Sequence, residues 1–191
     1  MVRSILLLGT GSMLASIMLF PAVVKSALNQ DHGRQAAPAQ DEELVHKKAS
    51  FSFAVPFAKS RVAPLFGAHG ERAWAKGWDP QFIHPRPAQD TQGAVFSVAH
   101  GGHSSTWITT IYDLKQGHFQ HVAFVAGSMV TLVDVQLQAT GESATQVEVT
   151  YQRTALTASM NDHVVERSAN DAKLGEHWRK AIIECLEKNA K

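Results

Sequence analysis

Cysteine is almost missing from this sequence of 191 residues, and neither sign of charge is in excess. Cys185 is its one cysteine, which excludes an intramolecular disulfide framework and any zinc-ribbon spacing. The 18 lysines and arginines are matched by 17 acidic residues. Because a nucleic-acid-binding protein normally carries a basic surplus or a basic stripe, we expect no nucleic-acid partner.

The sequence also lacks the short motifs of common catalytic sites. It holds no phosphate-binding loop and no dinucleotide fingerprint, and Gly102-His103-Ser104 lacks the rest of a nucleophile elbow. Ten histidines are present, but His118 and His121 would point to opposite faces of a strand. His103 and His118 would lie at opposite ends of the sheet. We therefore expect no metal and no cofactor.

The first 27 residues have the layout of a targeting segment. Arg3 is followed by an apolar run over residues 5–24, and then by the small residues Ser26 and Ala27. A secretory signal has this order, and the run is also long enough for an uncleaved membrane anchor. Either alternative places the body outside the cytoplasm, as a periplasmic or secreted protein or tethered to the outer face of the cytoplasmic membrane. Residues 28–49 are polar and predict a linker.

A single globular domain is expected over residues 50–191. Residues 50–56 alternate in the manner of a first strand, and residues 57–66, interrupted by Pro64, favour two short helices or turns. Period-two segments follow at 92–100, 104–113, 118–126, 129–138 and 145–156, with a further short strand at 81–84. Their short connections predict an antiparallel meander.

The chain is predicted to end in an amphipathic helix. Ser168 and Asp171 have capping-box spacing, and apolar residues then recur at helical spacing from Leu174 to Leu186. The apolar face of the sheet needs a cover, and this helix is the largest element available. We therefore expect a curved sheet wrapped around the helix.

Two stretches carry a resemblance to a known superfamily. GAHGERAWAKGWDPQFIHP, beginning at Gly67, and VEVTYQRTAL, beginning at Val147, resemble motifs of uncharacterised bacterial members of the START-like, or SRPBCC, superfamily. The resemblance covers residues 49–188. It implies an α+β helix-grip fold, with six to seven antiparallel strands around a long C-terminal helix and short helices after the first strand. It also implies a hydrophobic cavity between sheet and helix.

Strand alternation selects the side chains that would line such a cavity. Tyr151 and Arg153 share a face with Val147 and Val149 on the last strand, so they should point toward the helix. Trp107 shares a face with Thr109 and Ile111, and His121 and Met129 lie on the apolar faces of their own strands. The candidate ligand-binding residues are Tyr151, Arg153, His121, Trp107, Met129 and, from the helix, Trp178.

A dense polar and aromatic cluster follows the short helices. Glu71 and Arg72 could form a polar gate at the cavity mouth, with Trp74 and Trp78 as a lid. Alternatively, the tryptophans plug the end of the sheet beside an Asp79-Pro80 turn. Cys185 lies on the apolar stripe of the last helix and is expected to be inert packing.

Three functions fit these patterns. The leading hypothesis is binding or transport of a hydrophobic or amphipathic small molecule, lipids included, oriented by Tyr151, Arg153 and His121. The second is a polyketide cyclase-like enzyme that uses Glu71, His121 or Tyr151 as acid and base. The third is an exported partner-binding or structural protein with a filled core. A buried carboxyl or histidine beside a second titratable group would favour the enzyme.

Overall fold

A single curved antiparallel sheet dominates the computed structural model, which describes residues 43–100 and 103–189. Its seven strands have the order β1-β7-β6-β5-β4-β3-β2 in the described part of the chain. The strands are β1 (His46–Val55), β2 (Gln81–His84), β3 (Val95–His100), β4 (His103–Asp113), β5 (His118–Val125), β6 (Met129–Gly141) and β7 (Ala144–Ala155). Strands β2 to β7 form the predicted meander, and β1 pairs with β7.

Local sequence explains the tight turns between strands. Gly117 and Gly127 adopt φ values of 73° and 65° at the β4–β5 and β5–β6 turns, a conformation that glycine adopts at little cost. At Gly117 a Cβ atom would also come within 2.9 Å of Leu137 Cβ. The short connections therefore match the antiparallel pairing.

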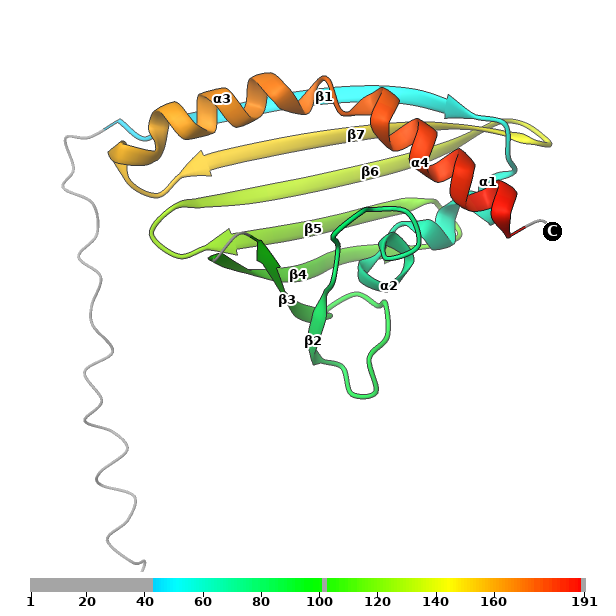
Figure 1. Cartoon of the computed structure of the whole chain (residues 1–191), viewed down its shortest axis with the longest axis horizontal. Coiled ribbons are helices and arrows are strands. Elements are labelled where there is room, and N and C mark those ends of the chain that lie inside the picture. Colours follow the sequence, from blue (N-terminus) through cyan, green and yellow to red (C-terminus); the bar gives the residue numbers. More distant parts are fainter. Residues whose placement is uncertain (1–42, 101–102, 190–191) are drawn as a thin grey trace, which may run out of the picture. The chain divides into compact units, whose positions relative to one another are not determined.

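Short helices and a pair of C-terminal helices complete the fold. Between β1 and β2 lie α1 (Lys59–Val62), a 3-10 turn at Ala63–Leu65 and α2 (Ala68–Glu71). After β7 come a 3-10 turn at Ala158–Met160, then α3 (Asn161–Asp171) and α4 (Gly175–Lys188). In Figure 1, α3 runs along β1, and α4 turns across the strands toward α1. The predicted helix-grip fold is confirmed.

The predicted capping box is wrong. Ser168 lies inside α3, where its buried Oγ has no hydrogen-bond partner among the described atoms. The Asp171 carboxylate is bound by Arg153, so it cannot reach back to Ser168. The chain instead breaks at Lys173 and Leu174 and restarts at Gly175, which packs so closely on Phe51 that a Cβ atom would lie 3.2 Å from its ring.

The main core lies between the concave face of the sheet and α4. Alternate residues of β7 are buried, and Val147 and Val149 are fully so, as the alternation predicted. From α4, Ile182, Cys185 and Leu186 close the layer. The burial of Cys185 agrees with its expected packing role.

A bulge in β4 changes the predicted inner face. Thr109 pairs with His121, but Ile111 pairs with Gln120, so Thr110 is an extra residue. The bulge reverses the alternation beyond this point. Tyr112, not Ile111, therefore packs on the inner side, with its ring 5.4 Å from that of Phe119.

The N-terminal predictions fall largely outside the described residues, including the apolar run at 5–24. Strand β1 begins at His46, inside the stretch expected to be a polar linker. Within residues 43–100 and 103–189, no helix has both the length and the hydropathy needed to cross a membrane.

Candidate functional site

Titratable side chains lie among apolar ones on the concave face of the sheet. Tyr151 projects from β7 and is 9% exposed, and its ring lies 6.5 Å from that of Trp178 on α4. His121 projects from β5, 5% exposed, with Nδ1 3.2 Å from the Thr109 hydroxyl. No hydrogen bond joins the Tyr151 hydroxyl to another described residue. This phenol is therefore free to meet solvent or a ligand.

Glu71 brings a carboxyl group to the same region. It ends α2 and is partly buried. Burial, and then repulsion from Asp90, raise the pKa of its carboxyl group to about 8, against a smaller opposing effect of the Gly67 backbone N–H. Burial and the nearby Glu71 likewise raise the pKa of Tyr151 above its usual range. Glu71 is therefore largely protonated at neutral pH and electrostatically coupled to Tyr151.

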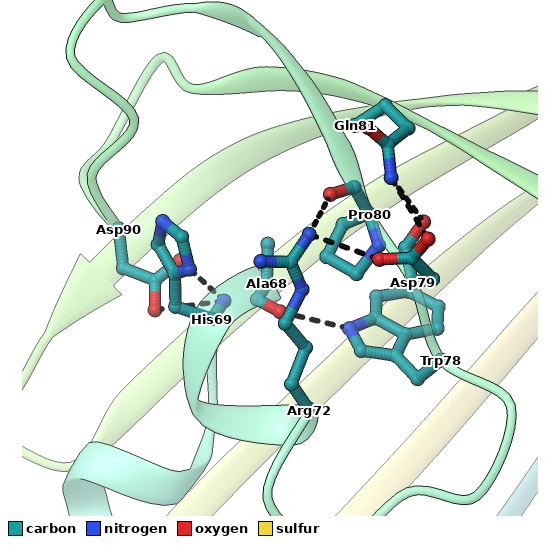
Figure 2. A network of polar contacts seen from close by, with 8 residues as sticks. All are labelled: Ala68, His69, Arg72, Trp78, Asp79, Pro80, Gln81 and Asp90. Atoms are coloured by element: carbon teal, nitrogen blue, oxygen red, sulfur yellow. Dashed lines mark hydrogen bonds and ion pairs between the residues drawn. The ribbon is translucent and has the colours of Figure 1, made fainter.

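Asp90, which the sequence did not single out, anchors α2. Its carboxylate accepts hydrogen bonds from the His69 backbone N–H, at 3.0 and 3.1 Å, and from the Gly70 N–H at 3.3 Å. Figure 2 shows Asp90 beside His69 at the start of this short helix. Burial and then Asp90 raise the pKa of Tyr112 to about 12. Asp90 therefore carries negative charge toward the interior while it fixes the helix.

His121 is neutral in the folded protein at physiological pH. Burial lowers the pKa of its imidazole to about 4, and the negative charge of Asp90 opposes this only in part. A buried neutral imidazole can donate or accept one hydrogen bond at each nitrogen. The inner face thus holds a neutral carboxyl, a phenol and a neutral imidazole.

Arg153 is committed to an internal ion pair. Its Nε and Nη2 donate to the Asp171 carboxylate at 2.8 and 2.7 Å, and Nη1 donates to the Thr131 hydroxyl at 2.9 Å. The guanidinium also lies 4.7 Å from the centre of the Tyr151 ring. Arg153 therefore joins α3 to the sheet and supports Tyr151 from one side.

Two of the predicted gate residues hold the segment after α2 in place. The Arg72 guanidinium pairs with Asp79 at 3.0 Å and also donates to the Pro80 carbonyl. The Trp78 Nε1–H donates to the Ala68 carbonyl at 2.9 Å. In Figure 2 the Arg72 and Trp78 side chains lie on neighbouring sides of the Asp79-Pro80 turn. Their contacts fold residues 72–80 back onto α2.

Trp74 lies between the core and an open hollow. Its Nε1–H donates to the Leu65 carbonyl at 2.8 Å, and its ring is 5.0 Å from that of Trp178. The hollow, of about 370 Å³, is lined by Ala73, Trp74, Ala181, Glu184, Cys185, Lys188 and Asn189. Trp178 thus contacts both Trp74, which lines the hollow, and Tyr151.

Two further predicted residues are Met129, which lies apart from the main core, and Trp107, whose ring lies 6.5 Å from that of His121. Met129 belongs to a separate small core with Ala155 and Val164, beneath α3. Trp107 donates to the Ser105 hydroxyl at 2.8 Å, stacks against Phe96 and meets Trp78 edge-on. The structure thus groups Glu71, Tyr151, Trp74 and Trp178, with His121 further along the sheet, and places Met129 apart from them.

Another hollow, of about 420 Å³, lies over the β5–β6–β7 end of the sheet and is lined by polar residues. Its walls include Gln116, Gln136, Gln138, Gln146 and Glu148. The first hollow is therefore the one that adjoins the aromatic core. No cluster of three or more metal-ligating side chains occurs in the part of the chain that the structure describes.

Comparison with solved structures identifies the fold. The chain superimposes on a norcoclaurine synthase point mutant from Thalictrum flavum in complex with a transition-state analogue, with a TM-score of 0.60, 9% identity, and coverage of 78% of this chain and 99% of the other. The chain also superimposes on Ara h 8.0201, with a TM-score of 0.57, 11% identity, and coverage of 75% of this chain and 99% of the other. For the ZhuI aromatase/cyclase from a Streptomyces species the TM-score is 0.54 at 10% identity, with coverage of 77% of this chain and 98% of the other.

These likenesses concern the fold alone, because the identities are at or below 11%. No known protein-family profile matches the chain. No curated protein matches it in sequence either. The architecture that the chain shares with them is the helix-grip fold.

Proposed function

We propose that this protein binds an amphipathic small molecule between the concave face of its sheet and α4. One observation carries the proposal: the Tyr151 hydroxyl lies on the concave face beside the rings of Trp178 and Phe51 and has no hydrogen-bond partner in the described chain. Ser168 Oγ is the one fully buried side-chain oxygen or nitrogen without a partner among the described residues, so the Tyr151 hydroxyl stays accessible to solvent. A ligand with a polar end would take the place of that solvent.

Affinity in such a site comes from the aromatic walls. Removing apolar ligand surface from water contributes about 25 cal/mol per Å², before the cost of ordering the ligand. Trp74, Trp178 and Phe51 form a continuous wall, with ring separations of 5.0 and 5.5 Å. Tyr151, Glu71 and the more distant His121 would orient the polar end, while Arg153 supports Tyr151 through its ring contact.

Entry is proposed through the hollow beside α4. Trp74 forms part of its floor and also contacts the core. Rotation of the Trp74 ring would break its single hydrogen bond to Leu65 and connect the hollow with Tyr151 and Glu71. This gives Trp74 the gating role expected of it, while Arg72 and Trp78 hold the neighbouring segment.

The fold neighbours and the sequence motifs support this proposal. The norcoclaurine synthase structure contains a transition-state analogue, so the same fold holds an organic molecule in that protein, and ZhuI is described as an aromatase/cyclase. The stretch GAHGERAWAKGWDPQFIHP further supports membership of the START-like superfamily. A lipid is one class of ligand that fits an apolar wall with a polar end.

A hollow-filling variant tests the proposed site. The full chain is titrated with the neutral fluorophore N-phenyl-1-naphthylamine, whose emission rises in apolar surroundings. Saturable binding is expected, with loss of at least tenfold in affinity in Ala181→Trp, which fills the hollow. Ala139→Trp, at an exposed position of β6, should bind as the unaltered protein does. Absence of saturable binding would indicate a filled core and overturn the proposal.

An acid–base enzyme is the second candidate function, and Glu71 favours it. A carboxylic acid whose pKa is about 8 holds a proton at neutral pH and can donate it to a reacting group. Tyr151 is the nearby second group that such chemistry uses. Turnover of a bound polyketide-like carbonyl compound that is lost in Glu71→Gln, with binding retained, would support this candidate; equal turnover would exclude Glu71 as the acid.

We also propose that the protein acts outside the cytoplasm. Support comes from Arg3, the apolar run at 5–24 and the small residues that follow, which have the order of a signal or anchor. Cell fractionation tests this: protein in the periplasm, medium or membrane fraction is expected, and protein confined to the cytosol would contradict it.

A further inference from the structure

A ladder of polar side chains crosses the face of the sheet that points away from α4. Figure 1 shows β5, β6 and β7 side by side, and the alternate residues that are not part of the core project from this outer face. His118, Gln136 and Glu148 form one cross-strand row, and Gln138 and Gln146 form the next. Three neighbouring strands therefore bring five polar side chains together.

Asp134 holds two members of this ladder in place. Its carboxylate accepts hydrogen bonds from His118 Nε2 at 2.8 Å and from Gln136 Nε2 at 3.1 Å, and Gln120 supplies a third donor at 2.8 Å. Burial acts to raise the pKa of Asp134, but these three hydrogen bonds lower it overall. The contacts leave His118 Nδ1 and Gln136 Oε1 without a partner among the described residues. Asp134 therefore orients two side chains whose other polar atoms can meet a ligand.

The turn between β4 and β5 closes one end of the ladder. Asp113 Oδ1 accepts a hydrogen bond from the Gln116 backbone N–H at 2.8 Å, and the Leu137 backbone N–H donates to the Gly117 carbonyl at 2.8 Å. Lys59, from α1, donates to the Gln116 carbonyl at 3.3 Å. The turn is therefore tied both to β6 and to α1, and it holds Gln116 in the same hollow as the ladder.

The hollow that these groups line, of about 420 Å³, has the size of a small-molecule site. Its polar side chains are those of Gln116, His118, Gln136, Gln138, Gln146 and Glu148. The lining drawn from the described residues includes no aromatic, lysine or arginine side chain, and Leu137 is its one large apolar residue. The hollow therefore presents a dense set of hydrogen-bonding groups and little that would hold a large apolar group.

Carboxamide side chains favour a ligand that both donates and accepts hydrogen bonds. Each glutamine offers two N–H donors and one oxygen acceptor, and an ionised Glu148 offers acceptors alone. A hydroxyl group likewise donates one hydrogen bond and accepts others. A phosphate or carboxylate would face the Glu148 carboxylate, and a hydrocarbon would leave the amides unpaired. A compact ring that carries several hydroxyl groups matches this set of side chains.

We propose that this outer hollow is a second binding site, which takes an uncharged pyranose sugar. Gln138 and Gln146 would pair with neighbouring hydroxyl groups of the ring, and Glu148 would accept a hydrogen bond from a further hydroxyl. The His118 ring, held by Asp134 at Nε2, would accept another at Nδ1. The site lies on the face of the sheet opposite the ligand proposed beside α4, so either site can exist without the other.

The test compares pyranose sugars with a ring that lacks most of their hydroxyl groups. The full chain is titrated with the methyl pyranosides of glucose, galactose, mannose and N-acetylglucosamine, and saturation-transfer NMR follows binding. At least one sugar is expected to bind saturably, with a dissociation constant of about 1 mM or lower. Tetrahydropyran-2-methanol, which keeps the ring and a single hydroxyl, is expected to bind at least about tenfold more weakly because it leaves the amides unpaired.

Matched variants locate the binding on the outer face. Gln146→Ala removes one amide from the hollow, and sugar affinity is expected to fall at least about threefold, the loss of one neutral hydrogen bond. The double variant Gln138→Ala with Gln146→Ala should lose about tenfold or more. Gln152→Ala, on the same strand and face but outside the lining, should bind sugar as the unaltered protein does. Ala181→Trp, which fills the hollow beside α4, should also leave sugar binding unchanged.

Three results would overturn the outer sugar site. The first is the absence of saturable binding for all four pyranosides, and the second is sugar affinity that the double variant leaves unchanged. Binding of tetrahydropyran-2-methanol as tightly as the sugars would overturn the recognition of hydroxyl groups. Loss of sugar binding in Ala181→Trp with affinity retained in the double variant would assign the sugar to the hollow beside α4, so the outer site would fall while the function proposed for the inner one stood.

Discussion

Arg153 and Asp171 form a two-pronged buried ion pair, with Nε 2.8 Å from Oδ2 and Nη2 2.7 Å from Oδ1. Arg153 lies on the concave face of β7, and Asp171 is the last residue of α3. The pair therefore fixes the point at which the chain leaves α3 for α4. Everything that α4 covers, Tyr151 included, depends on that point.

Removal of one partner of this pair is expected to destabilise the fold strongly. Asp171→Ala leaves the Arg153 guanidinium buried and uncompensated, which typically costs about 3–5 kcal/mol. Urea denaturation measures the loss. Glu176→Ala removes a carboxylate that is largely exposed and pairs with Arg179 at 3.3 Å, so it should change the free energy of unfolding by less than about 1 kcal/mol. Equal losses in the two variants would contradict the structural role of the pair.

Gly67→Ala is expected to be destabilising because the space for a side chain is occupied. A Cβ atom there would lie 2.7 Å from Asp90 Oδ2 and 3.0 Å from Tyr112 Cε2. Overpacking of this kind costs about 1–3 kcal/mol, and displacement of Asp90 would also loosen α2. Gly141→Ala, with nothing within 4 Å of the added atom, is the matched control in thermal unfolding. A melting temperature unchanged in Gly67→Ala would argue against this packing.

Glu71 should make the folded protein less stable as pH rises from 4.5 to 8. Burial and Asp90 raise its pKa from 4.5 to about 8 in the folded state, so within this window the folded state keeps a proton that the unfolded state has lost. One such proton corresponds to a slope of at most about 1.4 kcal/mol per pH unit. Glu71→Gln should remove this slope, measured as the difference between urea denaturation curves of the two proteins. Parallel pH profiles would contradict the raised pKa.

Below pH 6.5, His121 should make the free energy of unfolding rise with pH, the opposite of the effect expected from Glu71. Burial lowers the pKa of His121 from 6.5 to about 4 in the folded state, so between these values the unfolded state binds the extra proton. Its contribution to stability is present above pH 6.5 and is lost as pH falls toward 4. His121→Gln should flatten this part of the profile, whereas His163→Gln, exposed on α3, should not.

Much of the fold could be predicted from the sequence because β5, β6 and β7 alternate buried and less buried side chains over most of their length. The side chains of β7, from Val147 to Arg153, point as the period-two pattern predicted, since one buried face and one exposed face leave a strong signal. The short glycine-containing turns between consecutive strands correctly predicted that these strands pair antiparallel. The apolar spacing of α4 identified Trp178 and Cys185 as inward-facing residues.

The site was harder to predict because its key groups depend on local irregularities. The bulge at Thr110 turns Tyr112 inward, and a bulge leaves no periodic signal in the sequence. Asp90 lies in an irregular loop, so its contact with the start of α2 arises only from the folded path of the chain. Arg153 was expected to face a ligand, but it pairs with Asp171. Asp171 ends α3, a helix that the sequence analysis did not separate from α4, so the strand pattern could not reveal this partner.

Native mass spectrometry of the full chain, purified without detergent from a cell extract, tests the central claim most directly. The claim is that the interior between the concave sheet face and α4 holds a small molecule beside Glu71 and Tyr151. The predicted result is a discrete added mass that is absent in Ala181→Trp and retained in Ala139→Trp. Bare protein that takes up no mass from a lipid extract would contradict the claim and indicate a filled core.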